Sequence, residues 1–347
     1  MNRNRFWVAT WPWIIVAVLG FAVAPIPVLA QVGAGSDWAG VIDNAKREGA
    51  VAVYVGGDFE TVSLVFKAFE KKYGIRVDAL EGRATEIRER IRAEGASGRA
   101  IGDVSINGST TTAAQLGEGV FQQHPGLPAA ARLVRPFVDD GTSIPISVVR
   151  LGMMINTDHV KPGDAPKSWR DLLDPKWKGR ILSDDPRASG GAFVVFSVLY
   201  DKLGRAFHEK LAQQNLLFSR DLAVNERRIA NGEYPIYIPL NLQNLRRLPG
   251  LPVRGIAPSE GVAYLTFHAA MIKRAPHPNA ARLLMNFLLE DEAQQIIVSQ
   301  GVASPVGVVA KSLPAQLPVS LMTGPLLGTT DPLRQDELMG IFRTIYK

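Results

Sequence analysis

Hydrophobic residues follow two different spacings between residues 50 and 80 of this chain. Residues 51–55 form a short apolar run rich in valine, which predicts a buried strand. Apolar residues then recur at helical spacing from Val62 to Phe69, and Gly74 stands where such a helix would end. Residues 75–80 alternate between apolar and polar and predict the next strand. The connecting helix is long enough for a crossover, so we expect these two strands to be parallel.

The same alternation of strands and helices continues to residue 240. Helices are expected at 85–93, in a segment that runs towards Gly117, at 192–200 and at 224–231, and strands at 103–107, 181–182 and 234–240. Alternating strands and helices favour an α/β protein with a mainly parallel sheet.

Two segments break this rhythm and are candidates for connections between lobes. Residues 143–156 are mostly apolar and predict a long extended segment that leaves one lobe and enters another. Residues 254–263 are expected to be the return crossover, and residues 264–272 the strand that follows it. The tail from Lys311 onwards is rich in proline and leucine and ends in a predicted helix.

The first thirty residues have the pattern of a secretory signal. Arg3 and Arg5 precede an apolar run at residues 11–29, and small residues lead up to Ala30. The alternative is a permanent membrane anchor, but three prolines interrupt the run, and no apolar stretch of about 20 residues remains between them. We therefore predict cleavage after Ala30 and a location in the periplasm.

Composition narrows the class of protein further. Cleavage after Ala30 leaves 317 of the 347 residues, more than the roughly 250–300 that one hydrophobic core usually serves, so two lobes are expected. The chain has no cysteine, which excludes disulfides and lipid attachment through a leading cysteine. Loss of Arg3 and Arg5 would lower the formal charge from +6 to +4. Because the charges are mixed and no long basic run occurs, nucleic-acid binding is not expected.

Several short motifs occur in an order that resembles one protein family. They are Phe-Glu-Lys-Lys-Tyr at 69–73, Gly-Asp-Val at 102–104, Pro-Lys-Ser-Trp-Arg-Asp-Leu-Leu at 166–173 with Lys-Gly at 178–179, Pro-Arg-Ala-Ser-Gly at 186–190, Asn-Gly-Glu at 231–233 and Ala-Pro-His-Pro-Asn-Ala-Ala at 275–281. Each motif is common, whereas their order and spacing over residues 48–310 resemble the ferric-ion-binding-like branch of the solute-binding proteins that serve ABC importers.

The resemblance implies a two-lobed α/β fold of the type II periplasmic-binding class, with the lobes joined by two extended crossovers. The ligand would lie in the cleft between the lobes, and closure would be a hinge motion. A permease and an ATPase at the inner membrane would be the partners of a monomer that has no cofactor and no catalytic activity. We expect lobe one at residues 37–142 and 263–308, lobe two at 147–252, and the tail at 309–347 packed on lobe two.

Ligands of open α/β sheets bind outside the carboxyl ends of the strands, so the loops after the predicted strands are the candidate site. The residues we select from them are Gly57, Asp58, Arg83, Ser109, Thr110, Ser189, Gly190, Asn241 and Gln243. Helix starts bind anions through free N–H groups, and Arg83 or Arg187 could add a bidentate clamp. The alternative is that the serines and threonine are ordinary helix caps and the arginines lie in solvent.

The ligand set that ferric-ion binders use is missing here. The resemblance implies that ferric-ion binders have a pair of adjacent tyrosines at the positions that correspond to Leu242 and Gln243. It also implies a histidine in the loop that contains Asp58 in this chain. This chain has no Tyr-Tyr pair, and leucine cannot replace a phenolate as a ligand for a hard ferric ion. We therefore expect a phosphate-, phosphonate- or carboxylate-bearing solute and no metal site, with ferric iron as the alternative. Tyr234 and Tyr237 are expected to pack in the core.

Two further classes of function compete with transport. An enzyme could use Asp184, Asp185, Ser189 and His268. However, no Gly-x-Ser-x-Gly elbow surrounds Ser189, and Asp184-Asp185 before a proline is typical of a turn. A sensory binding protein would have the same fold, because fold does not determine function.

Overall fold

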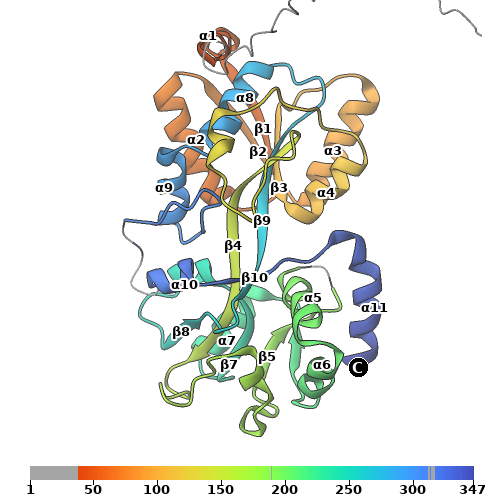
Figure 1. The fold of residues 1–347 in the computed structure, drawn as a ribbon, viewed down its shortest axis with the longest axis vertical. Helices are drawn as coiled ribbons and strands as arrows, with labels where there is room; N and C mark the ends of the chain where they lie inside the picture. The colour runs from red at the N-terminus through yellow and green to blue at the C-terminus, as the bar shows by residue number, and fades with distance from the viewer. Residues whose placement is uncertain (1–37, 189, 312, 314–316) are drawn as a thin grey trace, which may run out of the picture.

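The computed structural model describes residues 38–188, 190–311, 313 and 317–347. The predicted export signal at residues 1–30 lies outside this part of the chain. Two lobes lie one above the other, and two long strands, β4 (Ser143–Asn156) and β9 (Val262–Met271), run through both lobes (Figure 1). These strands pair antiparallel with each other from residue 143 to residue 151 of β4. The structure thus has the predicted α/β class, with two lobes joined by two extended crossovers.

One continuous sheet connects the lobes, with its strands in the order β2-β1-β3-β9-β4-β7-β5-β6. In addition, β8 pairs with β4, and β10 pairs with β9. The remaining strands are β1 (Ala50–Val55), β2 (Arg76–Glu81), β3 (Val104–Gly108), β5 (Ile181–Asp184), β6 (Leu217–Ser219), β7 (Ile236–Asn241), β8 (Val253–Ile256) and β10 (Leu326–Gly328). The pairs around β1 and around β5 are parallel, as predicted. The loops that follow these parallel strands are therefore the places to look for a ligand site.

Helices cover both faces of the sheet in each lobe (Figure 1). Lobe one, the upper lobe, contains α1 (Trp38–Glu48), α2 (Phe59–Tyr73), α3 (Ala84–Ser97), α4 (Ser109–Gly117), η1 (Pro128–Arg132), α8 (Pro278–Phe287) and α9 (Asp291–Ser299). Lobe two contains η2 (Trp169–Leu173), η3 (Pro175–Trp177), α5 (Gly191–Leu203), α6 (Arg205–Ala212), α7 (Leu222–Ala230), η4 (Leu242–Arg247), α10 (Val319–Thr323), η5 (Pro332–Arg334) and α11 (Gln335–Ile345). The apolar stripe of α2 is buried as its spacing predicts, and Gly74 ends that helix in a left-handed conformation. In the part of the chain that the structure describes, no helix has the length and apolar character needed to span a bilayer.

The predicted return crossover at residues 254–263 is wrong. Residues 253–256 form β8, which pairs antiparallel with residues 153–156 of β4 inside lobe two. The chain returns to lobe one along β9, which begins at Val262 and also covers most of the strand predicted at 264–272. A sequence pattern shows that a segment is a strand, but not which lobe its neighbours belong to.

The C-terminal segment contacts the crossover strands β4 and β9 and the helices α5 and α6. β10 pairs with β9, and the guanidinium of Arg150 on β4 donates hydrogen bonds to the carbonyl oxygens of Leu321, Gly324 and Pro325. Helix α11 lies against α5 and α6 (Figure 1). The residue limits expected for the two lobes stay predictions.

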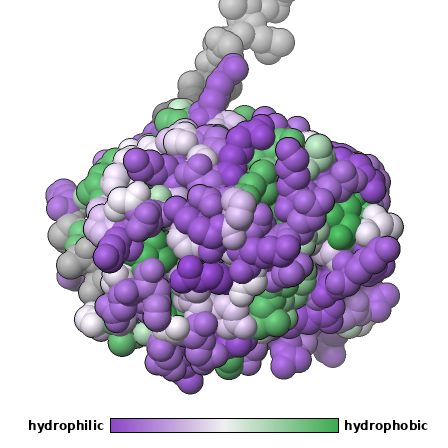
Figure 2. Space-filling view, turned by 90° about the horizontal axis from the view of Figure 1, so that it is seen from below, coloured by the Kyte–Doolittle hydropathy of each residue, from purple (hydrophilic) through white to green (hydrophobic). Residues whose placement is uncertain are grey.

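The lower end of the molecule is covered mainly by hydrophilic side chains (Figure 2).

Candidate functional site

A pocket of about 120 Å³ lies between the lobes, where the first turn of α4 meets the first turn of α5. It is lined by Gly108, Ser109, Thr110, Thr111, Gly190, Gly191, Phe193, Val194 and Leu265. Lobe one contributes the residues around α4, lobe two contributes those of α5, and Leu265 belongs to the crossover strand β9. Three of the predicted site residues, Ser109, Thr110 and Gly190, are therefore brought together here.

The local sequence explains why both helix starts are open to a ligand. Gly108 and Gly190 are the N-cap residues of α4 and α5, and neither helix has a side-chain cap. Gly190 has φ 148°, a conformation that side-chain-bearing residues rarely adopt. The N–H groups of a first helical turn have no partner within the helix, and the helix dipole adds partial positive charge there. The facing starts of α4 and α5 can thus hold an anionic group from both sides.

Asn241 lies beside this pocket, at the end of β7. A methyl group added to Gly191 would lie 3.7 Å from Oδ1 of Asn241, so the amide stands next to the first turn of α5. Gln243 is the second residue of η4 and packs against Gly301. Its buried Oε1 has no hydrogen-bond partner among the described residues. Gln243 does not line the pocket.

The loop after β1 approaches the crossover strand β9. Gly57 approaches the ring of Phe267 on β9 so closely that an added methyl group would stand 3.0 Å from it. Asp58 has a left-handed backbone, and its Oδ1 accepts a hydrogen bond from Oγ1 of Thr61 at 2.8 Å. Oδ2 is buried and has no partner among the described residues, and burial raises the pKa of this carboxyl group. Neither Gly57 nor Asp58 lines the pocket, and Asp58 carries the wrong charge for an anion.

The arginines predicted to clamp an anion behave differently from each other. Arg83 is exposed and makes no ion pair with any described residue, but it does not line the pocket. Arg187 is committed elsewhere, because its guanidinium binds the carboxylate of Asp185 at 2.8 Å and the carbonyl oxygen of Tyr346 at 2.9 Å. It also lies over the ring of Phe218. The prediction that Arg187 could clamp a ligand is therefore wrong. Ser189 lies outside the described residues.

The side chains considered for catalysis are held by their neighbours. Asp184 accepts hydrogen bonds from Asn225 at 2.8 Å and from the hydroxyl of Tyr237 at 2.9 Å, and burial raises its pKa to about 6. His268 is bonded to Thr266 at 2.8 Å, and burial lowers its pKa to about 4. Tyr237 is buried in a hydrophobic cluster, as predicted. Within the described ranges, no group of three or more histidine, aspartate or glutamate side chains could hold a metal ion.

One interlobe contact was not expected from the sequence. Glu60, in the first turn of α2, accepts hydrogen bonds from Arg246 at 2.7 Å and from Arg247 at 2.6 Å, both on η4 of lobe two. The two adjacent arginines after β7 are a visible signal, but nothing in the local pattern pairs them with a residue so far away in the sequence.

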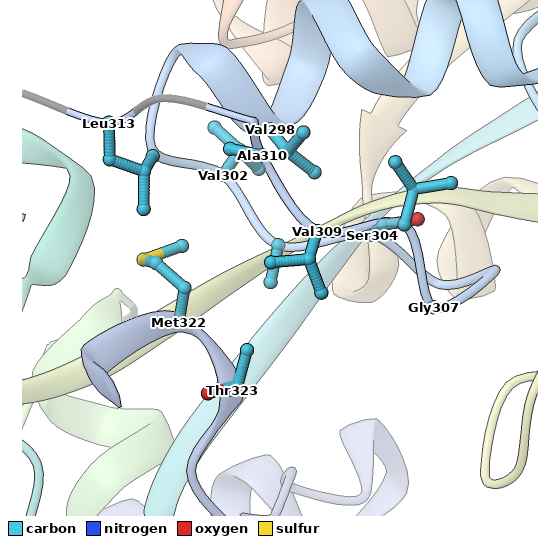
Figure 3. A pocket seen from close by; sticks show the side chains of 11 residues that line it. Val298, Val302, Ser304, Gly307, Val309, Ala310, Leu313, Met322 and Thr323 are labelled. Carbon is cyan, nitrogen blue, oxygen red and sulfur yellow. The ribbon is translucent and has the colours of Figure 1, made fainter. Parts of the chain in front are cut away.

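A second pocket, of about 220 Å³, lies between the segment after α9 and helix α10 (Figure 3). Its lining is mainly apolar, and Val298, Val302, Val309 and Met322 point into it (Figure 3). Among the described residues it is lined by the last turns of α9 and α10 and by no helix start, so it lacks the free N–H groups that favour an anion in the pocket between α4 and α5.

Comparisons with known proteins identify relatives of the chain. The family described as bacterial extracellular solute-binding protein matches residues 106–321. An uncharacterized protein of Haemophilus influenzae is 25% identical over 276 residues, which cover 75% of this chain and 79% of that protein. A Salmonella typhimurium protein named for periplasmic 2-aminoethylphosphonate binding is 26% identical and covers 72% of this chain and 75% of its own length.

Solved structures share the fold. Iron-bound HitA from Pseudomonas aeruginosa superposes with a TM-score of 0.67 at 24% identity, over 85% of this chain and 99% of that one. AfuA from Actinobacillus pleuropneumoniae, with fructose-6-phosphate bound, gives a TM-score of 0.63 at 19% identity, over 86% and 98%. Proteins with one architecture thus hold an iron ion in one case and a sugar phosphate in the other, so the fold alone does not identify the solute.

Proposed function

Because the chain belongs to the family of bacterial extracellular solute-binding proteins, we propose that it is the periplasmic substrate-binding component of an ABC importer and that its solute is a small anion. The observation that carries the second part is the pocket between α4 and α5, where two helix starts from different lobes face each other. An anionic group placed there gains from both helix dipoles only when the lobes are closed. Binding and closure would therefore be coupled.

The anionic group is a phosphate, phosphonate or carboxylate. Ser109 and Thr110 would donate hydroxyl or backbone hydrogen bonds, Gly190 would let the anion approach the backbone of α5, and Asn241 would bind a polar group on the rest of the solute. Ser189, Gly57, Asp58, Arg83 and Gln243 remain predicted contributors around the pocket. The relative named for 2-aminoethylphosphonate binding supports a phosphonate as one member of the panel to be tested.

The remaining parts of the proposal concern export and assembly. The protein would be exported with cleavage after Ala30, act as a monomer without a cofactor, and deliver its solute to a permease and an ATPase. It would catalyse nothing, since the candidate catalytic groups Asp184 and His268 are bound by neighbouring side chains.

The first test is a thermal-shift screen of the mature chain, freed of ligand by unfolding and refolding. The panel holds phosphate, sugar phosphates, phosphonates, dicarboxylates and ferric citrate. A solute at 100 times its dissociation constant should add about 2.7 kcal/mol to the free energy of unfolding. A shift with ferric iron alone would contradict the anion proposal and favour iron transport.

Two variants at one position then test the helix start directly. Ser109 is the first residue of α4, a position that tolerates proline, and the extended backbone of Gly108 is compatible with a following proline. Ser109→Pro removes the backbone N–H, whereas Ser109→Ala removes only the hydroxyl. We expect Ser109→Pro to weaken binding by at least tenfold and Ser109→Ala by less. Equal affinity of Ser109→Pro and the parent would show that this helix start does not hold the anion.

A further inference from the structure

The carboxylate of Glu60 and the guanidinium groups of Arg246 and Arg247 form a contact between the two lobes. Oε2 of Glu60 accepts one hydrogen bond from Nη2 of Arg246 at 2.7 Å and another from Nη2 of Arg247 at 2.6 Å. Glu60 belongs to α2 in lobe one, and both arginines belong to η4 in lobe two. Arg246 also donates through Nη1 to the carbonyl oxygen of Gln300, at the end of α9 in lobe one, at 3.1 Å. Three hydrogen bonds to charged groups thus connect the lobes at this place.

The surroundings favour this contact. The side chain of Arg246 is only 9% exposed, so its charge is largely removed from water and needs the partner. Glu60 lies in the first turn of α2, where the helix dipole stabilises a negative charge. The hydrogen bond from Arg247 holds the pKa of the Glu60 carboxyl group below its usual value, despite partial burial. The acidic side chains of Asp58 and Glu226 also interact electrostatically with these arginines, Asp58 with both and Glu226 with Arg247.

We propose that Glu60, Arg246 and Arg247 form a latch that holds the lobes together in the absence of solute and thereby sets the apparent affinity of the cleft. When the lobes separate, the carboxylate and the two guanidinium groups part. The latch therefore stabilises the closed state without touching the solute. Apparent affinity scales with the fraction of molecules in the binding-competent state. The part of the inference that concerns affinity rests on the proposed function, whereas the part that concerns closure does not.

The chain has no native cysteine, so two introduced cysteines can carry spin labels without interference. Lys71→Cys on α2 and Lys210→Cys on α6 place one label on an exposed position of each lobe. Double electron–electron resonance then measures the distance between the lobes in the solute-free protein. We expect one short distance in the parent and a longer population in Glu60→Gln. Glu60→Lys should increase that population, and Arg247→Glu added to Glu60→Lys should restore the short distance.

Glu89→Gln is the matched control, because Glu89 pairs with Arg92 within α3 of lobe one and should leave the distance unchanged. Once a solute is known from the thermal-shift screen, Glu60→Gln should weaken its binding about three- to tenfold. A distance distribution in Glu60→Gln identical to that of the parent would refute the latch. If the distance changes but no anion stabilises the parent, the latch stands and the anion proposal fails.

Discussion

Replacing Phe342 with alanine should destabilise the protein by about 3–5 kcal/mol, the usual cost of removing a fully buried phenylalanine side chain. Phe342 lies on α11, has no exposed surface, and packs against the rings of Phe196 at 6.1 Å and His208 at 5.5 Å between centroids. The ring of Phe193, which also lines the interlobe pocket, lies 6.2 Å away. The cavity cannot collapse easily, because its walls belong to α5 and α6, which are fixed by the sheet and by each other.

The assay is urea unfolding followed by circular dichroism, with Leu333→Ala as the control. Leu333 precedes α11 and is 94% exposed, so its truncation should change the free energy of unfolding by less than about 0.5 kcal/mol. A loss below about 1 kcal/mol for Phe342→Ala would refute the reasoning, since it would mean that α11 does not contribute its aromatic face to the core of lobe two.

Three further predictions concern buried ionisable groups. Arg150→Met should lower the free energy of unfolding by about 2–4 kcal/mol in calorimetry, because it removes the hydrogen bonds that fix α10 and the residues after it to β4. Burial lowers the pKa of His208 to about 3 and of His268 to about 4, from 6.5 in an unfolded chain. The unfolded state therefore takes up protons first, and stability should fall as pH drops below about 6.5; His208→Phe should reduce that slope in urea titrations. Asp184 makes stability depend on pH in the opposite direction, because burial raises its pKa from 3.8 to about 6. Its contribution to stability is present below pH 3.8 and is lost as pH rises through 6. Asp184→Asn should accordingly be more stable than the parent at pH 7.5 by on the order of 1–2 kcal/mol, with little difference near pH 4.

The long elements of this fold were predictable because each carries its own local signal. The apolar run at 143–156 coincides with β4, since a strand buried on both sides consists mainly of apolar residues. Gly74 ends α2 because a left-handed residue is required there. By contrast, β6 and β10 have only three residues each and exist through their pairing with β5 and β9, which no local pattern contains.

The candidate site was predictable only in part, for a geometric reason. Ser109, Thr110 and Gly190 meet because each lies at the start of the helix that follows a strand, β3 or β5, and these two helix starts line one pocket. Whether Arg83 or Gln243 reaches the same pocket depends on how one lobe is rotated against the other, and this rotation is not encoded in either loop. The sequence does contain an acidic partner for Arg187: Asp185 stands two residues before it and binds its guanidinium.

The contact of Glu60 with Arg246 and Arg247 also could not be predicted from the local sequence. Glu60 has the local signature of an ordinary acidic residue at a helix start, and Arg246 and Arg247 have that of a solvated basic pair. Neither local pattern indicates the contact, because it joins α2 to η4, two helices that lie far apart in the sequence. Charged groups whose contacts depend on the orientation of the lobes also respond when that orientation changes. If the lobes close around the solute as we propose, the residues least visible in the sequence are those whose contacts change most directly with that motion.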